Sequence, residues 1–304
     1  MQNKVEHISV MLNEVLTYLQ PHDGDVILDA TFGAGGYTKA ILNSSNCKVI
    51  ATDRDENVLK FANDIKNIYN DRFEFYNLKF SEIKNVLKEN SLDGIVLDLG
   101  VSSMQLDNAN RGFSFNKEAE LKMTMGKNDI NAYDIINNYD EKNIADIIYN
   151  YGEEVKSRVI AKKIIEYRKN KNIETTTELA NIVRSCFPNK KTKIDYATKT
   201  FQAIRIFVND ELNELQTILN DSIKLLKSNG RLVIVSFHSL EDRIVKNFFN
   251  KNGDTKLEKI NKYKDEKIKT IFKIITKKPV MVSEFEILKN NRSRSAKLRG
   301  AIKC

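Results

Sequence analysis

Residues 25–36, DVILDATFGAGG, place a short apolar run directly before three glycines, Gly33, Gly35 and Gly36. The chain holds only 12 glycines in 304 residues, so composition alone does not explain this cluster. Glycine permits tight turns and lets the backbone come close to a ligand. In open α/β sheets, ligands bind at the carboxyl ends of the strands. The segment therefore favours a ligand-binding loop between a strand and a helix over a plain turn.

The alternation of strand and helix continues through the first hundred residues. Four short apolar runs predict strands at residues 25–30, 48–53, 73–78 and 93–100. Helical apolar spacing occupies residues 36–44, 56–68 and 81–89 between them. This alternation predicts a parallel, doubly wound α/β sheet that is covered on both faces.

Beyond residue 106 the pattern becomes helical. TTTELA, with Glu178 in its first turn, predicts a capped helix start, and Gly230 is expected to stop the last helix. Strands are then expected at 230–237, 267–276 and 283–290, with a helix in SLEDRIVKNFFN and Pro279 in the last turn. We predict a core formed by residues 1–106 and 200–304, the latter ending in a basic tail. An inserted all-helical domain at 107–199 is expected to recognise the substrate.

Composition excludes several classes of protein. No run of eighteen apolar residues predicts a transmembrane helix, and the N-terminal residues do not resemble a signal peptide. Cys47, Cys186 and Cys304 are far apart and the three histidines are scattered, which predicts reduced thiols, a cytoplasmic location and no metal site. The net charge of +8 suits a polyanionic partner, but lysine-rich residue usage explains it equally well.

The spacing of the glycines narrows the choice of ligand. The dinucleotide pattern G-x-G-x-x-G fails because Thr38 occupies the third position, and no Gly-Lys-Ser/Thr phosphate loop follows. Asp53 ends the second predicted strand, where its carboxylate can accept hydrogen bonds from both ribose hydroxyls of a nucleoside. This combination favours S-adenosylmethionine, and it argues against a dinucleotide oxidoreductase.

Two further polar positions are expected near the same edge of the sheet. Asp98 interrupts an apolar strand, so we interpret it as a functional residue, whereas Ser102 beside it is also explained as part of a polar turn. His238 follows a buried strand and is a candidate to orient a base or accept a proton. Capping of the following helix is an equally good interpretation of His238.

The longer motifs resemble one family over nearly the whole chain, from about His7 to Arg299. They are HISVMLNEVL, DATFGAGGYTKAIL, LDGIVLDLGVSSMQLD, RGFSF, YGEE, TFQAIRIFVNDEL, GRLVIVSFHSLEDRIVK and RSRSAKLR. Together they closely resemble the bacterial 16S rRNA (cytosine-N4)-methyltransferase family, also called RsmH or MraW. The resemblance implies a Rossmann-like S-adenosylmethionine-dependent methyltransferase sheet with an inserted all-helical domain. It also implies methylation of a cytidine N4 amine in the decoding region of small-subunit rRNA, and it allows a homodimer.

The resemblance also assigns residues. The cofactor contacts it implies are Gly35, Gly36, Tyr37, Asp53, Phe80, Asp98 and Gln105, and the glycine spacing adds Gly33. The residues expected to act in catalysis are Asp98, Ser102 and His238. The residues expected to contact RNA are Arg111, Phe113, Arg205, Arg243, Arg292 and Arg294. Phe80 and Phe113 are also explained as core residues, and for Phe113 that explanation is the stronger one.

The sequence departs from the family pattern in the substrate-facing half. Asp195, Tyr196 and Lys199 replace His, Pro and Arg of the usual HPATRTF, and Lys122 and Thr124 replace an Asp and an Arg. Ser9 stands where Pro is usual. Composition does not distinguish RNA from DNA as the substrate, and only the family resemblance does. A methyltransferase acting on another nucleic acid is therefore the first alternative, and a non-catalytic RNA-binding protein is a further one.

Overall fold

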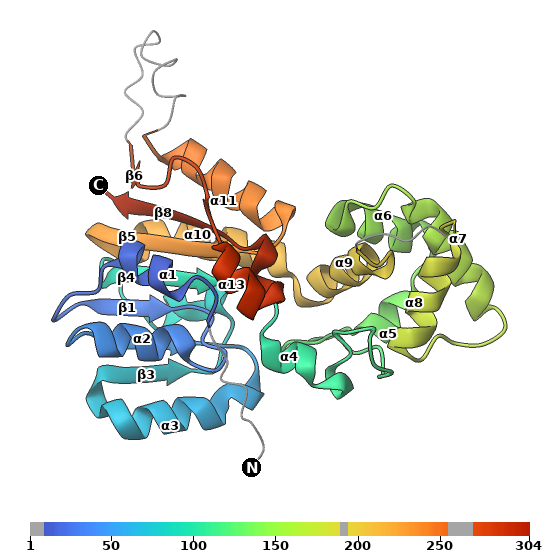
Figure 1. The fold of residues 1–304 in the computed structure, drawn as a ribbon, viewed down its shortest axis with the longest axis horizontal. Helices are drawn as coiled ribbons and strands as arrows, with labels where there is room; N and C mark the ends of the chain where they lie inside the picture. Colours follow the sequence, from blue (N-terminus) through green and yellow to red (C-terminus); the bar gives the residue numbers. More distant parts are fainter. Residues whose placement is uncertain (1–8, 189–193, 255–269) are drawn as a thin grey trace, which may run out of the picture. The chain divides into compact units, whose positions relative to one another are not determined.

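A computed structural model describes residues 9–188, 194–254 and 270–304 (Figure 1). The chain divides into two compact units. The first comprises residues 1–100 and 212–304, and the second comprises residues 101–211. The predicted strand at 267–276 lies partly outside the described residues.

The first unit is built on one mixed sheet of eight strands in the order β3-β2-β1-β4-β5-β8-β6, with β7 paired to β8. The strands are β1 Val26–Asp29, β2 Lys48–Thr52, β3 Phe73–Tyr76, β4 Leu92–Asp98, β5 Leu226–Ser236, β6 Phe272–Ile274, β7 Val280–Met281 and β8 Lys297–Lys303. The first five run parallel, and β8 is antiparallel to its neighbours. This arrangement confirms the predicted α/β class.

Helices cover this sheet. They are α1 Leu12–Leu19, α2 Gly36–Ser44, α3 Leu59–Tyr69, α10 Glu211–Leu225, α11 Ser239–Asn252 and α13 Glu284–Lys289, with 3₁₀ turns η1 Glu56–Val58, η2 Asn70–Arg72, η3 Phe80–Asn85 and η5 Asn291–Ser295. Because the central strands are covered on both sides, they are almost continuously apolar, and Ile95, Leu97 and Leu232 are fully buried. No helix among the described residues is long and apolar enough to cross a membrane.

The second unit is helical and has its own core. It contains α4 Ser103–Asp107, η4 Ala109–Arg111, α5 Ala132–Asn138, α6 Glu141–Gly152, α7 Ser157–Arg168, α8 Thr176–Ser185 and α9 Ala197–Asn209. Helices α6 and α9 pack closely, since a Cβ on Gly152 would lie 2.5 Å from the Lys199 carbonyl oxygen. Thr175 caps α8 together with Glu178, as the TTTELA motif predicted.

The unit boundaries differ from the predicted 106/107 and 199/200. Helix α9 belongs to the second unit because its buried face, including Phe201 and Ile204, packs into that unit's core. The residues after Gly100 also belong there, since Val101 and Leu106 pack against the same core.

Three predictions about the C-terminal half were wrong. Helix α10 ends at Leu225 and Gly230 lies inside β5, so that glycine does not stop the helix. Residues 284–289 form helix α13 rather than a strand, with Ser283 accepting a hydrogen bond from the Glu286 N–H. The last strand is β8, an interior strand between β5 and β6, where a basic tail was expected.

Candidate functional site

The carboxyl ends of β1, β2 and β4 meet at one edge of the first unit. β1 pairs in parallel with both neighbours, and Asp29 lies opposite Ala51 on one side and Val96 on the other. The last residues of these strands and the loops after them therefore lie side by side. Asp53 and Asp98 reach this edge as predicted from the sequence, and Asp29 joins them.

The glycine loop leaves β1 at this edge. Gly33 and Gly35 have φ of 54° and 76°, a region that favours glycine. A Cβ on Gly35 would lie 2.3 Å from Ile65 Cδ1 and 2.9 Å from the Phe32 ring, so no side chain fits there. α2 begins at Gly36, and its first main-chain N–H groups point out of the helix toward the loop. The loop can therefore present main-chain donors to an acceptor on a ligand.

A ligand contact through the Tyr37 side chain would need its hydroxyl or ring to face the loop, but the structure shows another orientation. Its side chain is buried, and its hydroxyl donates to the Val10 carbonyl oxygen. Burial, and next the nearby Asp98 carboxylate, raise the pKa of Tyr37 well above its ordinary value. The phenol is therefore a neutral donor committed to the chain itself, which leaves the main chain of Tyr37 for a ligand.

Asp53 is tied to the glycine loop. Its Oδ2 accepts the Gly33 N–H at 2.9 Å, and its Oδ1 accepts the Asp55 N–H at 2.9 Å. Burial raises the pKa of Asp53 to about 6, although these two bonds oppose the shift. Each carboxylate oxygen has a further lone pair, so the group can still accept hydrogen bonds from a ligand.

Asp98 is the least satisfied carboxyl group at this edge. Its main-chain N–H donates to Thr31 Oγ1 at 2.6 Å, but Oδ1 is buried without a hydrogen-bond partner among the described residues. Burial raises the pKa of Asp98 well above its ordinary value, and Asp29 and Glu241 add to the shift. Burying an oxygen without a hydrogen-bond partner costs free energy. Such an oxygen therefore indicates a group that binds a ligand.

Asp29 is a polar residue of this edge to which the sequence reasoning gave no role. It is fully buried, accepts the Thr38 hydroxyl at 2.7 Å and accepts the Thr31 N–H at 3.2 Å. Burial raises its pKa to about 6. The bond explains why Thr38 stands where a dinucleotide loop has glycine, because its hydroxyl ties α2 to the end of β1. The sequence feature that could have indicated this role is that an aspartate, Asp29, ends the first apolar run.

Phe80 follows β3 on the far side of β2. It begins η3 and is half-buried against the core of the first unit. The loop before it is held to the β2 end, because Thr52 Oγ1 donates to the Leu78 carbonyl and Asn77 Nδ2 donates to the Asp53 carbonyl. The start of η3 is thus held beside the carboxyl end of β2, on the same edge of the sheet as Asp53.

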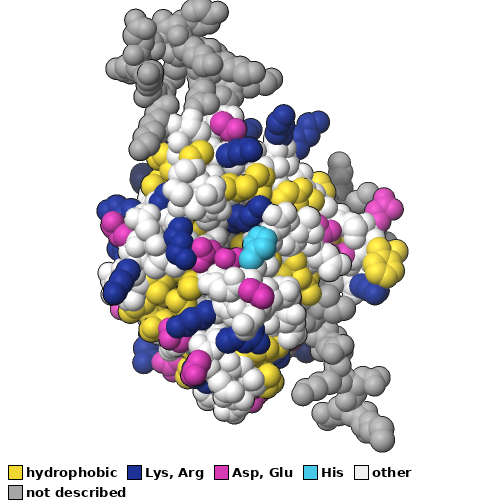
Figure 2. Space-filling view, turned by 90° about the vertical axis from the view of Figure 1, so that its left-hand side faces the viewer, with side chains coloured by type: hydrophobic (Ala, Val, Ile, Leu, Met, Phe, Trp, Pro, Cys, Tyr) yellow, Lys and Arg dark blue, Asp and Glu magenta, His cyan; other side chains and the backbone are white. Residues whose placement is uncertain are grey.

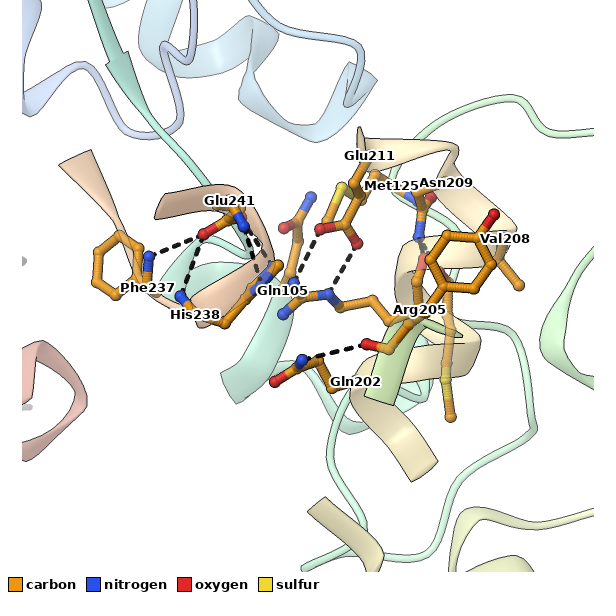
Figure 3. A network of polar contacts seen from close by, with 12 residues as sticks. Gln105, Met125, Gln202, Arg205, Val208, Asn209, Glu211, Phe237, His238 and Glu241 are labelled. Carbon is orange, nitrogen blue, oxygen red and sulfur yellow. Dashed lines mark hydrogen bonds and ion pairs between the residues drawn. The ribbon is translucent and has the colours of Figure 1, made fainter. Parts of the chain in front are cut away.

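His238 caps the start of α11, and the Glu241 side chain lies against the same cap (Figure 3). The Glu241 N–H donates to His238 Nδ1 at 3.5 Å, and His238 Nε2 lies 3.1 Å from Glu241 Oε1. Glu241 Oε2 accepts the Phe237 N–H at 2.8 Å. Nδ1 therefore serves the cap, whereas Nε2 is buried without a hydrogen-bond partner among the described residues, so the geometry supports the capping interpretation for Nδ1 and leaves Nε2 for a further partner.

In the second unit, Ser102 and Gln105 form a reciprocal cap at the start of α4. Ser102 Oγ accepts the Gln105 N–H at 3.3 Å, and Gln105 Oε1 accepts the Ser102 N–H at 3.0 Å. Gln105 is only 6% exposed. Both side chains have a local structural role, which accounts for their presence without a ligand.

Arg205 and its neighbours form a buried polar network (Figure 3). The guanidinium binds Glu211 through two bonds of 2.8 Å, and both side chains are largely buried. Asn209 donates to the Met123 carbonyl at 2.7 Å and accepts the Met125 N–H at 2.8 Å. Arg205 thus serves the second unit, with its charge already neutralised.

Two other predicted RNA contacts also take part in packing. Phe113 is 8% exposed and belongs to the core of the second unit. The Arg111 guanidinium lies 5.7 Å from the Phe113 ring centroid and donates to the Thr124 carbonyl at 2.8 Å. The side chain of Phe113 is therefore not available to stack on a base in this structure.

Five basic residues of α11, η5 and β8 differ in their exposure. Arg243, Arg292 and Arg294 are exposed, on α11 and η5. Lys297 and Arg299 of β8 instead bind Asp242 of α11, at 3.3 and 2.7 Å. Of these five residues, Arg243, Arg292 and Arg294 are the exposed ones.

The face of the first unit where the parallel strands begin offers little for a polyanion. Figure 2 shows Lys and Arg side chains interspersed with Asp and Glu across this face. Interspersed charges of both signs do not produce a strongly positive field. This face gives no reason to place RNA there.

The family departures in the second unit have partners. Asp195 accepts three hydrogen bonds from Arg184, the shortest at 2.8 Å, and accepts the Ala197 N–H at 2.8 Å. Tyr196 stacks on Phe187 with ring centroids 4.1 Å apart. Lys122 pairs with Glu120 at 2.6 Å. Asp195 and Tyr196 thus supply contacts that hold the start of α9.

Comparison with known proteins identifies close relatives. A sequence model of the MraW methylase family matches residues 4–304. The ribosomal RNA small subunit methyltransferase H of Rickettsia massiliae is 54% identical over 97% of each chain, and that of Rickettsia felis is 53% identical over 98% of each. Among solved structures, an rRNA methylase from Streptococcus thermophilus shares 12% identity with a TM-score of 0.40, over 96% of this chain and 93% of that one.

Proposed function

The chain belongs to the MraW methylase family, and we propose that it transfers a methyl group from S-adenosylmethionine to the N4 amine of a cytidine in 16S rRNA. The family match and the small-subunit rRNA methyltransferases at 54% identity support the reaction and the substrate class. The structural observation that carries the proposal is the edge where the glycine loop, Asp53 and Asp98 meet. This edge has the acceptors and main-chain donors that a charged nucleoside ligand needs.

The residues present fit S-adenosylmethionine. The loop around Gly35 has no room for a side chain, and the open lone pairs of Asp53 suit the two ribose hydroxyls. The buried, unpartnered Oδ1 of Asp98 marks a place where a donor is missing. Phe80 offers a half-buried ring to the adenine. When bound, the cofactor supplies a sulfonium methyl group that is already activated for displacement.

We assign the acceptor chemistry to Asp98. The lone pair of a cytosine N4 amine is delocalised into the ring, and an acceptor bonded to an amine hydrogen can favour the reactive, pyramidal form. The amine must also lose one proton when the new N–C bond forms. The raised pKa of Asp98 makes its carboxylate a stronger base than an exposed one. Ser102 remains a candidate second acceptor through its lone pairs.

His238 is a weaker candidate for the same role. Its Nδ1 accepts the Glu241 N–H at the start of α11, which ties the ring to the helix cap and leaves only Nε2 for a substrate. We therefore favour a positioning role for His238 at the start of α11. Its participation in catalysis stays a prediction.

For the RNA we propose contacts with Arg243, Arg292 and Arg294, which are exposed. The target base has to leave its stack to reach a methyl donor, so the substrate must be locally splayed open. We further propose that the second unit recognises the substrate, with Gln105 near its start, and that Arg205 and Phe113 support it from within. The assembled small subunit as substrate, a cytoplasmic location and a homodimer remain part of the proposal.

A methyl-transfer assay tests this function. Purified protein is incubated with isotope-labelled S-adenosylmethionine and, in parallel, with undermodified 16S rRNA, small subunits or DNA. We expect label in rRNA or subunits only, and none with the Asp98→Ala variant. Equal labelling of DNA would instead support the alternative, a methyltransferase for another nucleic acid.

A further inference from the structure

The segment Ser9–Met11, called the N-terminal strap below, packs against the start of α2. A Cβ built on Gly36 would lie 1.8 Å from Ser9 Oγ and 3.1 Å from Ser9 Cβ. One residue further, the buried Tyr37 hydroxyl donates to the Val10 carbonyl oxygen. The strap thus covers the two residues at which the glycine loop becomes a helix.

A residue near the C-terminal end of the sequence, Glu286 of α13, holds the strap in place. The Met11 N–H donates to Glu286 Oε1 at 2.9 Å, across 275 residues of sequence. Met11 is fully buried and has a φ of 54°, a conformation that costs energy for a residue with a side chain. Such a conformation persists only when its surroundings fix it, and the Glu286 carboxylate supplies a fixed acceptor for its N–H.

These contacts form one connected path. It runs from Glu286 in α13 through the main chain of Met11 and Val10 to Tyr37 and Gly36. We propose that Glu286 is a positioning residue for the cofactor loop, acting through the N-terminal strap. The inference rests on the proposed function only in taking the glycine loop as the place where S-adenosylmethionine binds.

The alternative is that Glu286 merely stabilises the fold. The two roles differ in their effect on the glycine loop, because a purely stabilising Glu286 would change the free energy of unfolding without changing ligand affinity or the exchange of residues 33–40. Glu286→Gln keeps an oxygen that can accept the Met11 N–H, whereas Glu286→Ala removes it. Glu284→Ala is the matched control, because Glu284 is an exposed carboxylate in the first turn of the same helix.

The first experiment measures binding and local order separately from turnover. Affinity for S-adenosylhomocysteine is measured by calorimetry, and hydrogen exchange of residues 33–40 is measured in the ligand-free protein. Loss of a hydrogen bond to a charged acceptor predicts about tenfold weaker binding for Glu286→Ala, with faster exchange at the start of α2. Glu284→Ala should resemble the wild type, and Glu286→Gln, which keeps an acceptor but loses the charge, should lie closer to the wild type than Glu286→Ala does. Wild-type affinity and exchange in Glu286→Ala, or equal losses in Glu286→Ala and Glu286→Gln, would overturn the proposal.

The second experiment tests the contact between the strap and the loop. Gly36→Ala places a methyl group against Ser9, so it should weaken binding of S-adenosylhomocysteine. Adding Ser9→Gly removes the opposing atoms and should restore most of the affinity. If the double variant binds as weakly as Gly36→Ala alone, the strap is not what Gly36 accommodates, and the proposal fails at this step.

These readouts separate the inference from the proposed function. A wild-type protein that binds S-adenosylhomocysteine but methylates no rRNA would contradict the proposed function and leave the strap fully testable. If the wild type did not bind the ligand, the exchange measurement in the free protein would still confirm or overturn the coupling between Glu286 and the loop.

Discussion

The affinity for the cofactor should depend on pH through Asp53. In the ligand-free protein, burial raises the pKa of this carboxyl group to about 6. The ionised form offers acceptors to two ribose hydroxyls, whereas the protonated form has an O–H in place of one acceptor. If only the ionised form binds, the apparent Kd rises by the factor 1 + 10^(pKa − pH).

The size of the effect follows from that relation. About nine tenths of Asp53 is ionised at pH 7 and about one tenth at pH 5, so binding should be about tenfold weaker at pH 5. Binding near pH 6 should also release a fraction of a proton. Calorimetry with S-adenosylhomocysteine in two buffers of different ionisation enthalpy measures both quantities.

Asp53→Asn isolates the contribution of this residue. The variant should bind more weakly at pH 7 and should lose most of the change between pH 5 and pH 7. Asp29, whose pKa is also about 6, remains in the variant, so the comparison between the two proteins is what counts. The reasoning is refuted if the wild-type affinity is constant from pH 5 to pH 7, or if Asp53→Asn retains the full tenfold change.

Four further predictions concern other residues. The pKa of Asp29 is raised to about 6, so the wild type should lose stability as pH rises from 4 to 6. Asp29→Asn lacks this loss. From pH 4 to pH 7, its free energy of unfolding should therefore rise by about 2 kcal/mol relative to that of the wild type, as measured by urea unfolding. Asp98→Asn should lower kcat by about 100-fold or more in single-turnover assays, and near-wild-type turnover would remove Asp98 from the mechanism. Phe113→Ala should lower the free energy of unfolding by about 3 kcal/mol because it leaves a cavity in the core. Arg292→Gln and Arg294→Gln should each reduce the slope of log affinity for RNA against log salt concentration by about 0.7 and leave the free energy of unfolding unchanged.

The sequence predicted the strands of the first half and the helices at 36–44 and 56–68 well because the signals there are local, whereas the helix expected at 81–89 is only a 3₁₀ helix, η3, at Phe80–Asn85. The runs that became β1 to β4 are apolar, short and separated by helical spacing, and the glycines lie directly after β1. Asp53 and Asp98 could be placed because parallel strands bring their carboxyl ends to one edge. These features need no knowledge of distant contacts.

The C-terminal region was misread because distant contacts decide its structure. EFEILK alternates polar and apolar residues like a strand, but the Ser283 cap and the hydrogen bond that Glu286 accepts from the Met11 N–H hold it as a helix. KLRGAIK carries basic residues that suggested a tail. Its Lys297 and Arg299 bind Asp242, which allows the segment to be an interior strand.

The role of side chains in the site was also only partly predictable. The pattern did not show that Tyr37 turns its hydroxyl to Val10, or that Asp29 binds Thr38. Nor did it show that Glu211 neutralises Arg205, since a lone arginine in a helix is equally consistent with RNA binding. Such choices depend on which partner the fold brings within hydrogen-bond distance.

The central claim is the identity of the methylated atom, and nucleoside analysis tests it most directly. Small subunits or 16S rRNA treated with the protein and labelled S-adenosylmethionine are digested to nucleosides, which are separated and identified by mass and fragmentation. The account predicts label in N4-methylcytidine. Label confined to another nucleoside, such as a cytidine methylated on ring carbon, would contradict it.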